Sequence, residues 1–271
     1  MGRVNRIELM EQEKISRPTL SKKFKLFLNK PLPLEVVWET LPPMCMRSSV
    51  PWVLGIDGKW LRRNGVVMIY RDVTRGENLY WSYHSSESYQ ALHTDLLTLT
   101  GLLGDHLPVG IISDWKGSIV SGVSGHFPGI PHQRCLVHVV RDAKIFLPKG
   151  SPMIDTRRLR TIARHLTKVE NKRDKTQWLK QLIQWEKIFG YLLTEKTINT
   201  NPKVNKKWWY THGNLRRGWN LLTKDWDPFF VHLNNPLIPS SNNSLEGTNS
   251  QIKKALTNHR GMKTLQQVSF L

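Results

Sequence analysis

The chain has 271 residues, 39% of them hydrophobic, which is enough for one substantial core with appended segments. It carries 40 Lys and Arg against 21 Asp and Glu, a formal net charge of +19 that favours a polyanionic partner such as nucleic acid. Its 2 cysteines are too few for a disulfide framework, and it has neither a long apolar run nor a signal-peptide pattern. We therefore expect no membrane contact and a cytoplasmic location, associated with the nucleoid if the source is bacterial.

The first 50 residues predict a small basic segment followed by a linker. Residues 1–30 predict a helix that is capped at Ser16 and has Pro18 in its first turn, preceded by a second helical stretch. This pair is similar to a helix-turn-helix, whose second helix enters the major groove of DNA. A solvated basic helix is the alternative. Residues 31–50 contain four prolines and predict a linker with one short helix around residues 35–40.

From residue 51 the pattern predicts strands and then alternating helices. The predicted strands are short apolar runs bounded by turn signals, at residues 52–57, 66–73, 79–84, 109–113 and 130–134. The predicted helices cover residues 87–103, pass through Ile119 and Val123, and begin beyond Cys135. This order is typical of the ribonuclease-H-like layout. We therefore predict an α/β fold with a mixed five-stranded sheet and helices on both faces.

A long insertion interrupts this predicted fold. Apolar stripes at helical spacing on basic segments predict an all-helical insertion over residues 150–240. Its tryptophans are expected to pack in a core, with base stacking as the alternative. Residues 241–265 then complete the catalytic domain that begins at residues 51–149, with a last helix over about residues 243–256.

Three acids stand in positions that indicate chemistry. Asp57 and Asp114 each follow an apolar strand, and Glu246 opens the last basic helix. Carboxylates gathered in a half-buried site repel one another unless a cation neutralises them, and oxygen ligands favour a divalent metal. Two such metals stabilise both the attacking and the leaving oxygen of a phosphoryl displacement. A metal-dependent enzyme acting on phosphodiesters is the prediction, against the alternative that acids end strands by chance.

A Cys-x-x-His pair follows the second aspartate. Cys135 and His138 have the spacing of half a tetrahedral zinc site, but Cys45 lies far away in the sequence and the other half is absent. We therefore expect a structural or positioning role, in which His138 lies near Asp114 and touches DNA or a phosphate. A zinc site is the alternative.

Four segments together carry a family resemblance. They are Gly55-Ile56-Asp57-Gly58, Ser113-Asp114-Trp115-Lys116-Gly117, His132-Gln133-Arg134-Cys135-Leu136-Val137-His138 and Ser241-Asn242-Asn243-Ser244-Leu245-Glu246-Gly247-Thr248-Asn249-Ser250-Gln251-Ile252-Lys253. In this order, over roughly residues 50–265, the chain resembles the Mutator-type DDE transposases of bacterial insertion sequences. The resemblance implies that Asp57, Asp114 and Glu246 are catalytic and hold Mg²⁺ (or Mn²⁺). It also implies that the helical insertion helps to hold transposon ends.

The expected function is metal-dependent DNA cleavage and strand transfer at insertion-sequence ends. The expected partner is double-stranded DNA, both transposon ends and target, bound by a homo-oligomer. We expect Lys253, Lys254 and Arg260 to contact phosphates, and Asn243 and Asn249 to contact DNA or position Glu246.

Two alternatives to this function stay open. The short amino-terminal region and the end at Leu271, earlier than is usual in the family, favour a truncated, inactive DNA-binding remnant. The other alternative is a ribonuclease-H-type nuclease without strand transfer, in which Glu87 supplies a fourth carboxylate.

Overall fold

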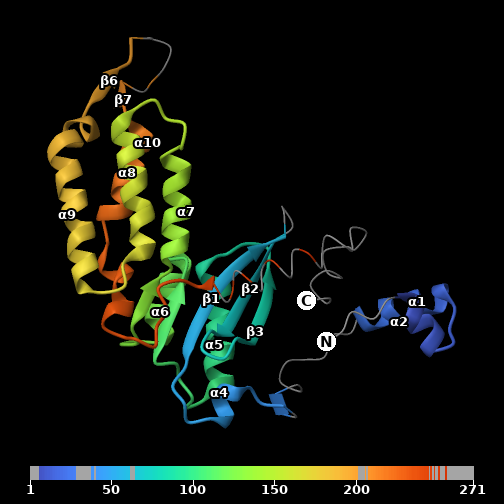
Figure 1. The fold of residues 1–271 in the computed structure, drawn as a ribbon. Coiled ribbons are helices and arrows are strands. Elements are labelled where there is room, and N and C mark those ends of the chain that lie inside the picture. Colours follow the sequence, from blue (N-terminus) through green and yellow to red (C-terminus); the bar gives the residue numbers. More distant parts are fainter. Residues whose placement is uncertain are drawn as a thin grey trace.

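The computed structural model describes residues 6–28, 38–39, 41–61, 65–200, 205, 207–243, 245, 247, 250 and 254. Its centre is a five-stranded sheet of β1 (Val53–Trp60), β2 (Val66–Asp72), β3 (Glu77–His84), β4 (Gly110–Ser113) and β5 (His132–Arg134). The strand order is β3-β2-β1-β4-β5 (Figure 1). β1, β2 and β3 pair antiparallel, whereas β4 and β5 run parallel to β1. This is the ribonuclease-H-like topology, so the predicted fold class is confirmed.

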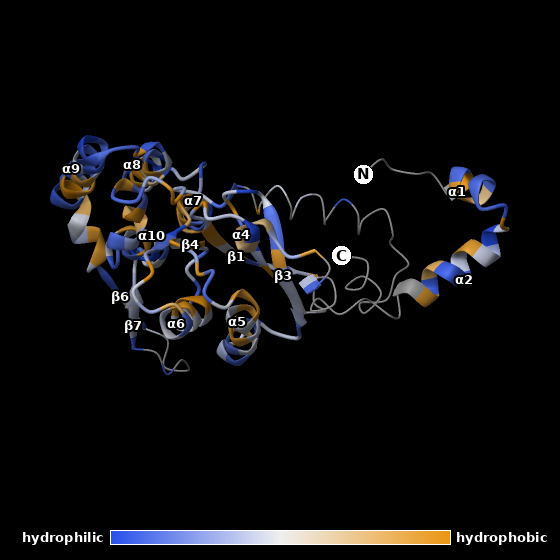
Figure 2. Cartoon of the chain, turned by 90° about the horizontal axis from the view of Figure 1, so that it is seen from below, coloured by the Kyte–Doolittle hydropathy of each residue, from blue (hydrophilic) through white to orange (hydrophobic). Residues whose placement is uncertain are grey.

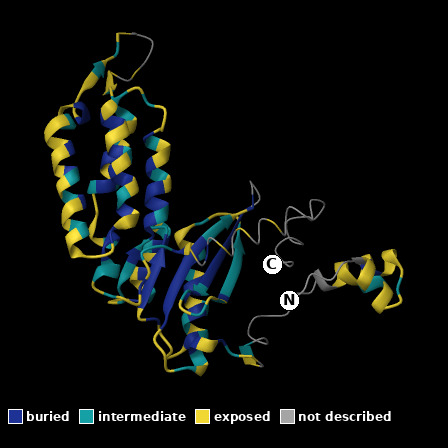
Figure 3. Cartoon of the chain, in the orientation of Figure 1, coloured by how far each residue is buried: buried dark blue, intermediate teal, exposed yellow. Residues whose placement is uncertain are grey.

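Two helices cover one face of the sheet, α5 (Tyr89–Leu103) and α6 (Gly117–His126). α5 begins after Ser88, whose side chain accepts a hydrogen bond from the backbone N–H of Ala91 and so caps the first turn. Every second residue of a strand points to the same face of the sheet, and such residues of β1 and β2 pack against α5. The fully buried residues of α5 in this contact are Leu92, Leu96, Leu99 and Leu103. β1, β2 and β4 are almost continuously buried, whereas β3 is mostly half-buried (Figure 3).

The other face of the sheet is covered by α7 (Leu136–Phe146) and by the chain that returns from the helical region. Ile238 lies so close to Gly110 of β4 that a Cβ atom at this glycine would clash with it. The fully buried Gln133 of β5 also holds the chain that returns from the helical region. Its side chain donates to the carbonyl of Phe229 and accepts from the N–H of His232. The segment that leads to residue 245 is thereby held against β1 and β4.

Residues 150–240 form a helical region stacked on the end of the sheet, with α7 as its link (Figure 1). Its helices are α8 (Ile154–His165), α9 (Lys172–Phe189) and α10 (Gly213–Thr223), with 3₁₀ turns at Leu166–Lys168, Gly190–Leu193, Asp227–Phe229 and Val231–Leu233. Trp178, Trp185 and Trp219 lie in its core, as the apolar stripes predict. α8 and α9 each have a hydrophobic face toward the core and a hydrophilic face on the outside (Figure 2).

The insertion also contains two strands that the sequence analysis did not predict. β6 (Lys196–Ile198) and β7 (Trp208–Tyr210) pair antiparallel as a small sheet of their own. Only the helical character of the insertion was therefore predicted correctly, and its description as all-helical is wrong at this hairpin.

The first helices are α1 (Arg6–Gln12) and α2 (Arg17–Leu28), joined by a short turn. The predicted cap is present, since Ser16 Oγ lies 3.4 Å from the backbone nitrogen of Thr19. The helix-turn-helix interpretation stays a prediction. The short helix expected around residues 35–40 lies largely outside the described residues.

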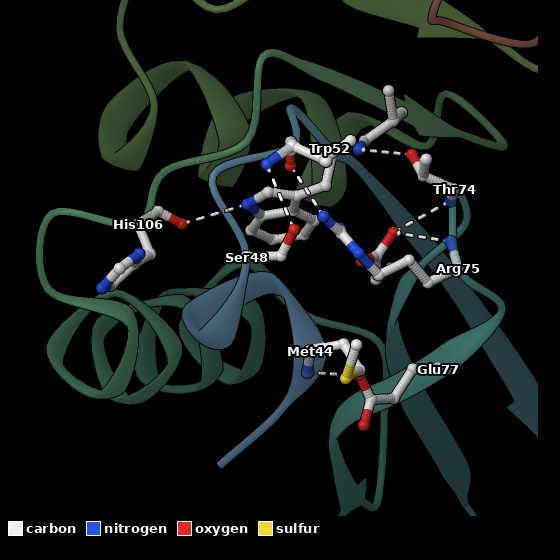
Figure 4. A network of polar contacts seen from close by, with 10 residues as sticks. Met44, Ser48, Trp52, Thr74, Arg75, Glu77 and His106 are labelled. Carbon is white, nitrogen blue, oxygen red and sulfur yellow. Dashed lines mark hydrogen bonds and ion pairs between the residues drawn. The ribbon is translucent and has the colours of Figure 1, made fainter.

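The end of the predicted linker is fixed to the sheet by polar contacts (Figure 4). α4 (Met44–Arg47) donates its first N–H to the Glu77 carboxylate of β3 at 2.8 Å. Arg75 pairs with the buried Asp72 at 2.7 Å and also donates to the carbonyl of Val50. This network holds the start of β1 to the β2–β3 turn, at the end of the sheet where β1 begins. No helix in the described part of the chain is both long and apolar enough to cross a bilayer.

Candidate active site

Asp57 and Asp114 are brought together by the parallel pairing of β1 and β4. Ile56 pairs with Ser113 in the register of the two strands, so the aspartates occupy the next position on each chain. Neighbouring strands are about 4.8 Å apart, which places the two side chains within reach of a shared ion. The negative charge of Asp114 contributes to the pKa of Asp57, as expected for close carboxylates.

The position of Asp57 differs in one respect from the sequence prediction. The first strand was expected to end at Asp57, but β1 continues to Trp60 because Gly58, Lys59 and Trp60 pair with β2. Asp57 therefore lies within β1 and pairs with Ile69 of β2, whereas the pairing with β4 ends at Ile56. Asp114, in contrast, follows directly after β4, as predicted.

The turn after β4 is strained and tightly held. Trp115 has a φ of 68°, a left-handed conformation that a bulky side chain rarely adopts. Ser113 Oγ accepts from the N–H of Trp115 and hydrogen-bonds His132 at 2.8 Å, and the His132 ring packs 4.6 Å from the Trp115 ring. Such strain costs about 1–3 kcal/mol and persists only where surrounding contacts over-determine the backbone, which is common at functional sites. Here it directs Asp114 and Lys116.

Lys116 joins Asp114 to a second acid, Glu87. The Lys116 ammonium lies 2.6 Å from Glu87 Oε2 and 3.1 Å from Asp114 Oδ2. Glu87 also lies against β1, since a Cβ atom at Gly58 would be 3.1 Å from Glu87 Oε2. Burial alone would lower the pKa of Lys116, but its contacts with Glu87 and Asp114 raise it. One lysine thus balances part of the charge of this acidic cluster.

The surroundings of Asp57 disfavour its ionised form. Burial, and then the charge of Asp114, raise its pKa to about 6. Asp57 accepts a hydrogen bond from the N–H of Gly58 at 3.0 Å, whereas the buried Asp95 accepts hydrogen bonds from Tyr70 and Ser82 and pairs with His84. A buried carboxylate with a raised pKa, beside a second carboxylate and a cleft, is a candidate functional group.

Cys135 and His138 lie on the wall beside this acid pair. Cys135 is fully buried between β5 and α7, and its sulfur accepts a hydrogen bond from the N–H of Asn242 at 3.2 Å. It therefore positions the segment that leads toward residue 246. His138 lies one turn further along α7 and lines the same cleft as Asp57. Burial, and then the charge of Arg141, lower the pKa of His138 to about 4.

An open cleft of about 570 Å³ lies between β1 and α7. Asp57 and Gly58 of β1 and His138 of α7 line it, together with the cationic side chains of Lys59, Arg141 and Lys144. Ser250 also lines it, so the last described residues reach this space. Among the described residues, Asp57 is the acid that lines this cleft, and a carboxylate beside several cations suits a metal-dependent site for a phosphate ester.

Several buried polar atoms around the site have no hydrogen-bond partner within the described ranges. They are Glu87 Oε1, His138 Nδ1, Arg134 Nε and both amide atoms of Asn242. A buried polar atom without a partner costs about 1–3 kcal/mol, so these atoms are candidates for contact with a bound ligand. Sequence reasoning missed Asn242, Lys116, Arg141 and the cleft cations Lys59 and Lys144, because only the fold brings them together. The Ser-Asp-Trp-Lys run was the one available signal for Lys116.

The donor set fits a divalent metal such as Mg²⁺ or Mn²⁺. Carboxylate oxygens of Asp57 and Asp114 lie at adjacent strand positions, and hard cations prefer such oxygens. The uncompensated oxygens of Glu87 and Asn242 add further acceptors nearby. Within the described ranges, however, no three His, Cys, Asp or Glu residues stand together as a complete metal site. This finding also leaves the zinc alternative for Cys135 and His138 without further ligands in that part of the chain.

The remaining predicted residues divide into two groups. Asn243 and Lys254 are exposed. Four others lie outside the described residues: Glu246, Asn249, Lys253 and Arg260. Leu245 is fully buried against Leu61, Val67 and Ile69, and with Asn242 it lies on Gly55 of β1. The segment that carries the predicted third acid is thus anchored on the strand that carries the first.

Neither the models of known protein families nor the curated proteins give a match to this chain.

Proposed function

We propose that this chain is a DDE transposase, similar to the Mutator-type enzymes of bacterial insertion sequences, which cuts and joins DNA with Asp57, Asp114 and Glu246. The observation that carries the proposal is the pairing of Asp57 and Asp114 on adjacent parallel strands, beside a cation-lined cleft. The raised pKa of Asp57 and the unpartnered polar atoms around it support a site that is completed by a cation.

The chemistry assigns a role to each side of the cleft. Mg²⁺ or Mn²⁺ held by the three acids would supply charge stabilisation for the attacking and leaving oxygens. Water attacks a phosphodiester at the transposon end, and cleavage of the P–O3′ bond releases a 3′-hydroxyl. That hydroxyl attacks a target phosphodiester in the same manner, so one P–O bond forms as another breaks. Lys59, Arg141 and Lys144 hold the phosphates, and Asn242 and Cys135 position the chain next to Glu246.

The distribution of charge supports a DNA substrate. Residues 150–240 carry 17 Lys and Arg against 7 Asp and Glu, a difference of +10 within the total of +19. A surface of this kind attracts the phosphate backbone independently of sequence, and its affinity falls as salt releases the bound counterions.

The test uses duplex DNA that contains the sequences flanking the coding region, incubated with Mg²⁺ and a second, circular target DNA. The proposal predicts single-strand cuts at defined positions and a product in which a cut 3′ end is joined to the target. DNA binding without any cut would support the inactive remnant.

A nuclease without strand transfer is the second candidate, and one observation favours it. Glu87 directly precedes α5, adjoins Gly58 of β1 and shares Lys116 with Asp114, as a fourth carboxylate of the site would. Cut products that are never joined to the target, under conditions where both DNAs are bound, would establish this alternative. A Glu87→Gln variant that keeps full cutting activity would remove its support.

A further inference from the structure

The tryptophans of the helical region fall into two classes. Trp178, Trp185 and Trp219 are at most 9% exposed and form its core. Trp208 and Trp209, on the β6–β7 hairpin, are 41% and 40% exposed. Since burial is the main gain that a tryptophan offers to folding, two neighbouring exposed ones indicate a surface kept for contact.

The two strands of the hairpin are hydrogen-bonded to each other at both ends of their ladder. Its ladder is closed at one end by the N–H of Asn199 donating to the carbonyl of Lys207, and at the other by Thr211 donating to Glu195. Arg216 of α10 fixes its base by donating to the carbonyl of Leu193 at 3.0 Å. The aromatic side chains are therefore presented on ordered backbone rather than on a loop.

One face of the hairpin alternates aromatic rings and cations. Trp208 and Tyr210 meet edge to face at 5.2 Å. The Lys196 ammonium lies 4.1 Å from the centre of the Trp208 ring, and the Arg216 guanidinium lies 4.0 Å from that of Tyr210. Cations held over aromatic rings give the face both π surface and positive charge.

Trp209 lies between these two residues in β7 and so points to the opposite face of the hairpin. It pairs in register with Thr197, whose side chain is small, and it is 40% exposed. Residues 195–217 carry six Lys and Arg against a single Glu. The sequence of the hairpin and the start of α10 is therefore cationic, and β7 carries Trp208 and Tyr210 on one face and Trp209 on the other.

We propose that this hairpin binds unpaired bases of DNA, with Trp209 and Trp208 stacking on them and the surrounding cations holding the backbone. Exposed aromatic rings interleaved with cations are the features that bind single strands without sequence preference. Unpaired bases are the fitting ligand because duplex stacking covers the flat faces of paired ones. The choice of DNA as the ligand rests on the proposed function. The hairpin lies at the end of the helical region far from the sheet, so it contacts DNA away from the reacting phosphate (Figure 1).

The test compares full-length wild-type protein with Trp208→Ala and Trp209→Ala by fluorescence anisotropy. The probes are a labelled oligothymidine strand and a labelled duplex of equal length, at one fixed salt concentration. We expect each variant to bind the single strand about 5- to 150-fold more weakly, which corresponds to the loss of one stacked base. Duplex affinity should change less than about twofold, because no phosphate contact is lost.

Two matched variants identify the cause of any loss. Trp226→Ala removes a 37% exposed tryptophan outside the hairpin and should leave single-strand binding unchanged. Trp209→Phe keeps a stacking ring and should restore most of the affinity. Equal losses for the single strand and the duplex, accompanied by a lower melting temperature, would assign the tryptophans to folding and overturn the inference.

The outcomes separate this inference from the proposed function. Wild-type affinity for the single strand in both alanine variants would overturn the inference even if the enzyme cuts and joins DNA. Tryptophan-dependent single-strand binding without Mg²⁺-dependent cleavage would support the hairpin and contradict the transposase. A protein that binds neither probe would contradict both.

Discussion

The sheet region and the helical region of this protein differ in their charged residues and in the side chains that form their cores. Residues 51–149 carry 10 Lys and Arg against 8 Asp and Glu, whereas residues 150–240 carry 17 against 7. The sheet is packed by aliphatic side chains such as Leu92 and Ile56, while the helical core is centred on Trp178, Trp185 and Trp219. The difference teaches that most of the net positive charge lies in the helical region, whereas Asp57 and Asp114 lie in the sheet region beside the few cations that line the cleft.

α7 is the element that connects these two chemistries. Its first turn carries His138 beside Asp57, and its later turns carry Arg141 and Lys144 along the cleft. Its apolar face packs with the helical region. In the proposed function, these cations of α7 offset the repulsion between the carboxylates and the DNA phosphates.

The largest expected effect concerns the aromatic core of the helical region. Trp178→Ala should lower the free energy of unfolding by about 3–5 kcal/mol, since it empties a large buried volume and removes the hydrogen bond from the indole to the carbonyl of Ile162. Chemical denaturation measures the change, with Leu92→Ala as the matched deletion in the sheet core. If the regions unfold separately, only the transition of the region that carries the substitution should shift; a shift of both would show a single cooperative unit.

Asp114→Asn should reduce DNA cleavage more than about 100-fold. Loss of a group that merely supports a metal ligand costs about 10–100-fold, and loss of the ligand itself should cost more. DNA binding should persist or become slightly tighter, because a charge that repels phosphate is removed. Quantified cleavage in Mg²⁺ alongside a binding titration provides the measurement. Wild-type cleavage rates would rule out Asp114 as a ligand.

The pH dependence of stability should report the raised pKa of Asp57. Between about pH 4 and pH 6 the unfolded chain has released this proton while the folded, metal-free chain retains it, so folded stability falls as pH rises. The contribution is on the order of 2–3 kcal/mol, complete below about pH 4 and lost above about pH 6. Asp57→Asn should remove it.

His132 and His138 complicate the wild-type curve. Burial lowers both pKa values to about 4, so these two groups make stability rise with pH over much the same window. The diagnostic quantity is therefore the difference between wild type and Asp57→Asn in denaturation at each pH. A difference that does not vary with pH would contradict the raised pKa.

The smallest expected effect concerns the cations of the cleft. Lys144→Gln should lower the slope of log affinity against log salt by about 0.9, the value for one phosphate contact, with only a few-fold loss of affinity. Lys149→Gln is the matched control, since this lysine lies beyond the end of α7 and does not line the cleft. Equal slopes for the two variants would place DNA elsewhere on the molecule.

The fold was predictable because its signals are local. Apolar runs at β1 and β4, and leucines at helical spacing in α5, determine the order of elements. The end of β1 was not predictable, because the apolar run stops before Asp57 and residues 58–60 are strand only through their pairing with β2. The β6–β7 hairpin was missed since each strand has only 3 residues and its support comes from cations over rings.

The residues of the candidate site were predictable only where a local sequence pattern marks them. Asp57 and Asp114 could be chosen because each follows an apolar run. The Lys116 bridge to Glu87 spans 29 residues, and the Asn242 contact with Cys135 spans 107. Contacts between such distant positions depend on how strands and helices pack, which no local pattern contains.

Binding of Mn²⁺ to the purified protein tests the central claim most directly, because it needs no knowledge of the DNA sequence. Isothermal titration should show saturable binding by wild type and a loss of more than about 100-fold in affinity for Asp57→Asn, Asp114→Asn and Glu246→Gln. Asp105→Asn, which removes an exposed acid away from the cleft, should bind as wild type. Binding that is unchanged in all three site variants, or absent from wild type with and without DNA, would contradict the assignment of these acids to a metal-dependent active site.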